Sequence, residues 1–135
     1  MKFWQLRIIF EKYFGNNRTK SATSYLKGKN YEALATTFLK SKKYKILKRN
    51  FTTKLGEIDI IALHNDYLIV CEVKYRTNQE ILMYSILPNQ KKRIQNALLI
   101  FLTRYKQYKN YNIRFDAIFI NNNNHIEHVI NAWHS

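Results

Sequence analysis

Cysteine, glycine, proline and acidic residues are all scarce in this chain of 135 residues. The single cysteine, Cys71, excludes a disulfide framework and any zinc site that needs several thiolates. Three glycines and one proline exclude collagen-like and other low-complexity chains. No apolar run approaches the roughly 18 residues of a membrane span. Because hydrophobic residues still make up 46% of the chain, residues 1–135 are expected to form one soluble, intracellular domain.

The shortage of acidic residues leaves a large positive charge. Lys and Arg number 23 against nine Asp and Glu, which gives a formal net charge of +14. AT-rich coding explains part of the lysine content, but it does not explain the lack of Asp and Glu. A strongly basic domain attracts polyanions, and nucleic acid is the commonest polyanion in a cytoplasm. We therefore expect a cytoplasmic protein that binds nucleic acid. An anionic membrane surface, an acidic partner and a homodimer stay open.

The hydrophobic pattern predicts an α/β fold, with a central mixed β-sheet of about five strands flanked by helices. Helical periodicity marks residues 22–42 and a stretch of about 20 residues that Pro88 opens. Runs rich in Ile, Val and Tyr predict strands at 44–49, 57–63, 67–75, 113–120 and 125–132. The turn His64-Asn65-Asp66 predicts a hairpin, and the long helix allows the strands around it to pair in parallel.

Residues 1–27 are expected to add an N-terminal helical segment. Within it, residues 3–14 carry an apolar stripe at helical spacing, and Gly15 ends the pattern. Such a helix packs on its own domain or on a partner chain, or it lies on a membrane surface.

Carboxylates stand inside two of the predicted apolar strands. Glu57 and Asp59 are two residues apart and share a face, and Glu72 and Lys74 repeat this spacing on the next strand. A hairpin centred near residue 65 makes Asp59 and Glu72 neighbours to within one residue of register. Two carboxylates inside an apolar sheet repel each other, and a divalent cation such as Mg²⁺ relieves that repulsion. The alternative is that these charges form cross-strand ion pairs on a solvent-facing sheet.

Two motifs carry a resemblance to a known family. Residues 56–61 read Gly-Glu-Ile-Asp-Ile-Ile, and residues 71–76 read Cys-Glu-Val-Lys-Tyr-Arg. This pair resembles the YraN family of small bacterial proteins, which is similar in turn to the PD-(D/E)xK, or restriction-endonuclease-like, nucleases. Shorter matches extend the resemblance over residues 28–133. They include Tyr31-Glu32-Ala33, in which Tyr31 replaces a usual glycine, and Arg114-Phe115-Asp116.

The resemblance implies roles for five residues. Asp59 and Glu72 would bind Mg²⁺ or Mn²⁺ together with the backbone carbonyl of Val73. Lys74 would be the catalytic lysine that positions the attacking water. Glu32 would be the helix-borne acid found in members that resemble Holliday-junction resolvases, and it would complete or tune the metal and catalytic site.

Basic residues around these motifs are predicted to contact nucleic acid: Arg49, Lys54, Arg76, Lys91, Lys92 and Arg93. Lys91 shares the apolar stripe of its helix and should point toward the sheet, where it reaches a phosphate or turns its charge outward. Lys92 and Arg93 should point elsewhere.

Three other residues are assigned structural roles. Asp116 is expected to form a salt bridge, and Cys71 is expected to be a buried core residue. His125 and His128 would face opposite sides of a strand, which argues against a metal site there.

Together with the resemblance, the candidate site residues imply a nucleoid-associated, Mg²⁺-dependent nuclease that hydrolyses phosphodiester bonds in DNA, which is favoured over RNA. Branched and single-stranded structures are candidate substrates. The alternative is a non-catalytic nucleic-acid-binding module of the same fold. A third class is an interaction protein whose N-terminal helix docks on a membrane or partner.

Overall fold

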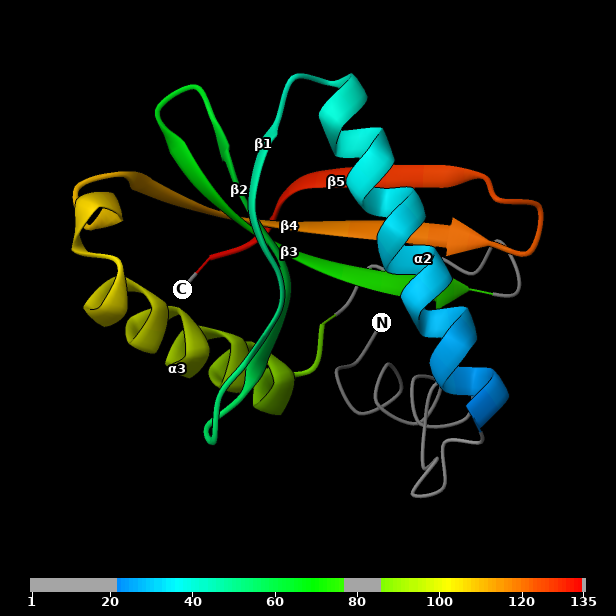
Figure 1. The fold of residues 1–135 in the computed structure, drawn as a ribbon, viewed down its shortest axis with the longest axis horizontal. Coiled ribbons are helices and arrows are strands. Elements are labelled where there is room, and N and C mark those ends of the chain that lie inside the picture. Colours follow the sequence, from blue (N-terminus) through cyan, green and yellow to red (C-terminus); the bar gives the residue numbers. More distant parts are fainter. Residues whose placement is uncertain (1–21, 77–85, 135) are drawn as a thin grey trace.

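The computed structural model describes residues 22–76 and 86–134, and for residues 22–29 and Arg76 it describes the backbone alone. In chain order the elements are α2 (Ala22–Ser41), β1 (Lys45–Thr52), β2 (Glu57–His64), β3 (Tyr67–Arg76), α3 (Pro88–Arg104), the 3-10 helix η2 (Lys106–Tyr108), β4 (Asn112–Asn121) and β5 (Ile126–Trp133) (Figure 1). The predicted α/β class, with a five-stranded sheet flanked by helices, is confirmed. The helix predicted at residues 3–14 lies outside the described residues.

The five strands form one mixed sheet in the order β1-β2-β3-β4-β5. β2 and β3 form the predicted antiparallel hairpin, in which His64 pairs with Tyr67. Asn65 in this turn has a φ of 52°, a left-handed conformation that asparagine tolerates. β3 and β4 pair in parallel over their whole length, because α3 carries the chain back between them.

Each face of the sheet carries its own hydrophobic cluster and its own helix (Figure 1). Alternation along β4 shows this division, since Phe119 belongs to one cluster and Ile118 and Ile120 belong to the other. α3 covers the Phe119 face with Ile94, Ala97, Leu98 and Phe101. α2 covers the opposite face with Ala35 and Leu39. The sheet is therefore covered on both sides, and the alternative of a solvent-facing sheet is wrong.

Two elements differ from the predicted bounds by more than one residue at an end. β1 continues to Thr52, beyond the predicted end at residue 49, although Asn50 has a φ of 49° and the register shifts between Ile46 and Lys48. The irregular backbone hides the strand from a pattern of alternating residues. α3 ends at Arg104, and the short η2 follows it. No helix in residues 22–76 and 86–134 is long and apolar enough to cross a membrane.

Candidate functional site

The hairpin of β2 and β3 opens at Asp59. Its ladder runs from the pair His64–Tyr67 to the pair Ile60–Cys71. At the next position a side chain replaces the backbone carbonyl as the hydrogen-bond acceptor. The N–H of Val73 donates to Asp59 Oδ2 at 2.8 Å. The register makes Asp59 and Glu72 neighbours, as predicted from the turn. The Asp59 carboxylate therefore lies between two diverging strands.

The side of the sheet that the β2 side chains face also changes at Asp59. Ile60 packs in the cluster beneath α2, but Ile58 packs in the cluster beneath α3. Regular alternation would place both residues on one face, so β2 twists at Asp59. Because of this twist, Asp59 can interact with acids that come from both faces of the sheet.

Glu72 forms the side of the site that faces α3. It is only 8% exposed. Gln90 Nε2 donates to Glu72 Oε1 at 2.6 Å, and Lys74 Nζ lies 3.2 Å from the same oxygen. A cavity of about 330 Å³ opens here between β2, β3 and the first turns of α3, lined by Glu57, Glu72, Lys74, Leu87, Asn89, Gln90, Arg93 and Ile94.

Glu32 approaches Asp59 from the other face, on α2. Its Oε2 atom is buried and has no hydrogen-bond partner. Burial raises the pKa of Glu32 to about 7, and the nearby Asp59 carboxylate adds to the rise, which Asn50 and Arg49 partly offset. An orphaned carboxylate oxygen beside a second carboxylate is an environment that a proton or a cation would stabilise.

Burial and neighbouring carboxylates also disfavour the charged forms of Asp59 and Glu72. Burial raises the pKa of Asp59, although the Val73 N–H and the charge of Lys74 act in the opposite direction. Burial, and then the Asp59 carboxylate, raise the pKa of Glu72 well above its usual range. Three acids thus share a region in which Lys74 supplies only part of the compensating charge.

The donors at this site are carboxylate oxygens, which suit a hard cation such as Mg²⁺. The orphaned Glu32 Oε2 is a further available oxygen. Within the described ranges, however, no group of three or more His, Cys, Asp and Glu side chains is spaced to hold a metal ion. Because Mg²⁺ takes one or two carboxylates and completes its octahedron with water and phosphate, Asp59 and Glu72 still fit it.

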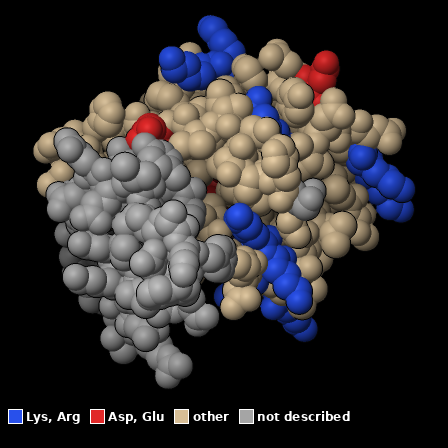
Figure 2. Space-filling view, turned by 180° about the vertical axis from the view of Figure 1, so that it is seen from behind, with Lys and Arg blue, Asp and Glu red and all other residues tan. Residues whose placement is uncertain are grey.

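The predicted nucleic-acid contacts lie around the site rather than in one cluster. Arg49, Lys54 and Lys92 are exposed, and Lys91 is half-buried. Arg93 lines the cavity, so the expectation that it points elsewhere is wrong. Lys91 is not among the lining residues, and its neighbour Gln90 makes the contact with Glu72. The side chain of Arg76 lies outside the described residues. Figure 2 shows basic side chains at several separate places on one face of the molecule, with few acidic ones beside them.

Two residues that hold the site together were not singled out from the sequence. Gln90 fixes the Glu72 carboxylate, and only its place one residue before Lys91 could have pointed to it. Gly56 lets the β1–β2 turn lie directly on α3, because a Cβ at this position would overlap the carbonyl oxygen of Arg93. Its place directly before Glu57 was visible, but its contact with α3 was not.

Asp116 forms the predicted structural ion pair. It is fully buried on β4 and accepts two hydrogen bonds from Arg114 at 2.9 and 2.8 Å. It also contacts His128 Nε2 at 2.8 Å and accepts the backbone N–H of Asn131 at 3.0 Å. Cys71 is buried as predicted, and burial together with nearby carboxylates raises the pKa of its thiol, so it does not resemble a nucleophile.

Comparison with known proteins gives consistent matches. The sequence model of a family described as "Uncharacterised protein family UPF0102" matches residues 31–120. A UPF0102 protein of Brucella canis is 31% identical over 103 residues, which cover 76% of this chain and 82% of the relative. A relative from Rhodopseudomonas palustris is 34% identical over 119 residues, covering 88% and 82%. One from Francisella tularensis subsp. tularensis is 43% identical over 84 residues, covering 58% and 68%.

Proposed function

The chain belongs to the uncharacterised family UPF0102, and from the acids within the matched residues we propose that it is a metal-dependent nuclease that hydrolyses phosphodiester bonds in DNA. One observation carries the proposal. Asp59, which is partly buried, and Glu72, which is buried, lie side by side where two strands diverge, and Lys74 lies 3.2 Å from the Glu72 carboxylate. Clustered carboxylates of this kind cost stability unless a proton or a cation neutralises part of their charge. The restriction-endonuclease-like motifs in residues 56–61 and 71–76 support the same reading.

In this proposal each residue has a separate task. Asp59, Glu72 and the Val73 carbonyl hold the cation, which is Mg²⁺ or Mn²⁺. Once bound, the cation would activate a water and neutralise charge on the scissile phosphate. Lys74 orients the attacking water, and Gln90 and Lys74 together keep the Glu72 carboxylate in place. Glu32, with a pKa of about 7, is suited to exchange a proton near neutral pH.

Basic side chains would hold the DNA backbone beside this site. Arg93 and Lys74 border the cavity, and Arg49 lies near Glu32. Arg49, Lys54, Arg76, Lys91 and Lys92 would extend the contact to phosphates on either side. A nuclease that acts on DNA in this way would work in the cytoplasm at the nucleoid.

A second candidate is a non-catalytic nucleic-acid-binding module of the same fold. The observation that favours it is that no group of three or more candidate metal ligands occurs in residues 22–76 and 86–134. The module would need the positive charge of the chain but not the acids at Asp59 and Glu72. Cleavage that depends on these two acids therefore separates the two candidates.

Purified protein should be incubated with duplex, single-stranded and branched DNA in the presence of Mg²⁺ or Mn²⁺. We expect Asp59→Asn and Glu72→Gln to abolish cleavage and to leave DNA binding intact or tighter, because ligation is lost while repulsion of phosphate falls. Asp66→Asn is the matched control, since Asp66 is exposed in the β2–β3 turn, outside the cavity lining. Cleavage at the parental rate by either site variant would contradict the proposal.

A further inference from the structure

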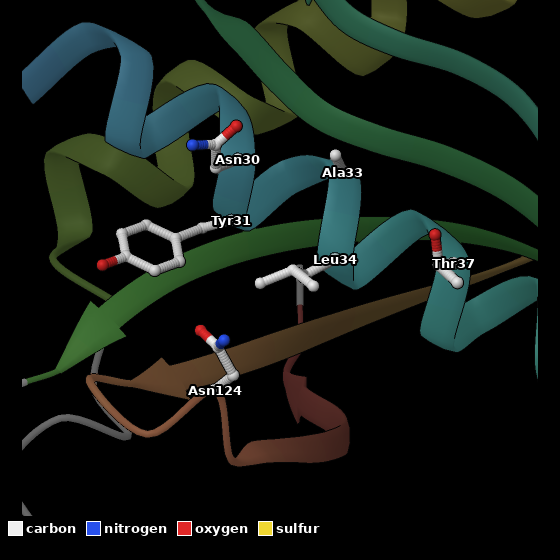
Figure 3. A pocket seen from close by; sticks show the side chains of 6 residues that line it. All are labelled: Asn30, Tyr31, Ala33, Leu34, Thr37 and Asn124. Atoms are coloured by element: carbon white, nitrogen blue, oxygen red, sulfur yellow. The ribbon is translucent and has the colours of Figure 1, made fainter.

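A second cavity lies along α2, outside the acidic site. It measures about 490 Å³, which is within the range of small-molecule pockets. Six residues line it: Asn30, Tyr31, Ala33, Leu34 and Thr37 of α2, and Asn124 of the turn between β4 and β5 (Figure 3). In Figure 3 the Asn124 side chain rises from its turn toward α2, where it faces the Leu34 side chain and the Tyr31 ring. The proposed chemistry of the acidic site does not use this cavity.

An aromatic pair connects this cavity to the acidic site. The ring of Tyr31 stacks on the ring of Tyr75, with centroids 4.7 Å apart and an interplanar angle of 14°. Tyr31 directly precedes Glu32 on α2, and Tyr75 directly follows Lys74 on β3. Because successive residues of a strand face opposite sides, Tyr75 faces α2 while Lys74 lines the cavity beneath α3. The two rings therefore lie on the α2 face, from which Glu32 approaches Asp59, and a nucleotide adjoining a phosphate at the carboxylates would reach the cavity from the Glu32 side.

The lining suits a flat, uncharged, heteroaromatic group. Tyr31 offers an aromatic surface and Leu34 an aliphatic one, and none of the six lining residues is charged. The Asn124 amide carries both a hydrogen-bond donor and an acceptor, and Asn30 and Thr37 add further polar groups. Nucleobases are recognised in this way, by stacking on aromatic rings and by hydrogen bonds to their edges.

We propose that this cavity receives one unpaired nucleobase of the nucleic acid whose phosphate lies at the carboxylates. The inference rests on the proposed function and narrows its substrate class to strands that present an unpaired base, such as single-stranded or branched DNA. A fully paired duplex presents no base to the cavity unless a nucleotide is first flipped out of the stack.

The test measures base recognition in the absence of divalent cation, so that no cleavage occurs. One labelled strand carries a single 2-aminopurine flanked by abasic sugar phosphates, and a second strand of equal length is abasic throughout. We expect the full-length protein to bind the first strand about tenfold more tightly, with quenching of the 2-aminopurine fluorescence, because stacking of one base on an aromatic ring contributes roughly 5- to 150-fold in affinity. Tyr31→Leu should abolish both the preference and the quenching.

Further variants keep the test decisive if Tyr31→Leu fails to fold. Asn124→Gly removes the amide and tolerates the φ of 58° at this position, and it should reduce the preference several-fold. Tyr31→Phe keeps the ring and should keep the preference. Tyr67→Leu, at the opposite end of β3 from Tyr75, is the matched control and should behave as the parent does.

Equal binding of the two strands by the parent protein would overturn the proposal, as would an unchanged preference in a folded Tyr31→Leu or Asn124→Gly variant. Cleavage assays separate this failure from failure of the proposed function. Asp59-dependent cleavage without base preference would reject the pocket alone. Base preference without cleavage would reject the nuclease alone.

Discussion

At the scale of single residues, Asp116, which is buried, and Asp59, which is partly buried, have different surroundings in the same sheet. Asp116 accepts hydrogen bonds from Arg114 and Asn131 and contacts His128, so its charge is fully compensated. Asp59 accepts one backbone hydrogen bond and lies beside the carboxylates of Glu72 and Glu32. Each carboxylate accepts a hydrogen bond from a backbone N–H of the neighbouring strand, at a point where the backbone hydrogen bonds between the strands are interrupted. The negative charge of Asp59, however, is not fully compensated.

Asp116→Asn should therefore destabilise the protein by about 3–5 kcal/mol at pH 7, because it leaves the guanidinium of Arg114 without its counter-charge. Burial alone would raise the pKa of Asp116, but the hydrogen bonds from His128, Arg114 and the Asn131 N–H outweigh it and hold that pKa below its usual value. A carboxylate with a depressed pKa stabilises the fold above the unfolded-state pKa, and this contribution is lost as the pH falls through the folded-state pKa. Denaturant unfolding of parent and variant should show the difference at pH 7 and a smaller one near pH 3.

Asp59→Asn should have the opposite effect in the metal-free protein. It removes a repelling charge, so the melting temperature should stay the same or rise by a few degrees. A raised carboxyl pKa makes the folded state bind more protons, so its cost appears as the pH rises above the unfolded-state value, between about 4.5 and about 7 for Glu32. The advantage of the variant should therefore grow from pH 5 to pH 8.

Calorimetry with and without Mg²⁺ completes this experiment. If Asp59 is a ligand of the cation, saturating Mg²⁺ should raise the melting temperature of the parent and leave that of Asp59→Asn unchanged, since a ligand that binds only the native parent stabilises only the parent. A loss of about 2–3 kcal/mol in metal-free Asp59→Asn would contradict the prediction. It would mean that Asp59 is held in a structural ion pair.

At the scale of elements, the β1–β2 turn fixes α3 against the site. Thr53 closes this turn, because its hydroxyl accepts the N–H groups of Leu55 and Gly56 at 3.1 Å each. Gly56 then lies against the backbone of Arg93 with no room for a side chain. The first turns of α3 place Gln90 and Arg93 at the cavity. Their position is thus fixed by contact with the β1–β2 turn as well as by packing of their own side chains.

Gly56→Ala should cost about 2–3 kcal/mol of stability, because the new methyl group must push α3 away from β2. The same displacement should withdraw Gln90 from Glu72 and lower any Mg²⁺-dependent cleavage more than tenfold at temperatures where the variant is folded. Leu55→Ala, at an exposed neighbour in the same turn, should change stability by less than about 0.5 kcal/mol. Equal effects of the two substitutions on thermal unfolding and on cleavage would show that the contact with α3 does not matter.

The elements also show how far the sequence alone could go. The turn residues Asn65 and Asp66 predict the hairpin and its register, and that register places Asp59 beside Glu72. These are local patterns, and local chemistry determines them. The twist of β2 at Asp59 and the seat of α3 on Gly56 depend on tertiary packing, which no residue spacing encodes. For this reason the sequence pattern singles out Lys91, as a residue that reaches the site or turns outward, and does not single out Gln90, which makes the contact with Glu72.

At the scale of the whole molecule, the charges are distributed unequally between interior and surface. Among the described acids, Glu72 and Asp116 are buried, and Asp59 in β2 and Glu32 in α2 are partly buried, which leaves few negative charges on the surface. Basic residues such as Lys45, Lys92 and Lys109 are exposed. The surface is therefore more positive than the formal charge of +14 alone conveys, as the face in Figure 2 illustrates. Such a surface attracts phosphates without regard to base sequence.

Binding of DNA should consequently weaken steeply with salt. Contacts with about five phosphates imply a slope near −4.5 in log K against log salt, or a loss of roughly 500-fold between 50 and 200 mM. Replacing Lys92 and Arg93 together by alanine should reduce the magnitude of this slope by up to about 2, since these side chains lie on the first turns of α3, where Arg93 borders the cavity. Fluorescence anisotropy over a salt series measures the slope directly.

Lys106→Ala with Lys109→Ala is the matched control, because it removes the same charge beyond the opposite end of α3. If the backbone of the DNA follows the acidic site, this pair should lower the affinity slightly and leave the slope almost unchanged. Equal changes in slope from the two double variants would mean that the whole surface attracts DNA without a defined track.

A membrane or protein partner makes a different prediction, namely weak DNA binding at every salt concentration. Flotation with anionic vesicles, using full-length protein and protein lacking residues 1–14, tests that case. Firm vesicle binding that the truncation abolishes, with no DNA shift at 50 mM salt, would reject both the DNA track and the nuclease.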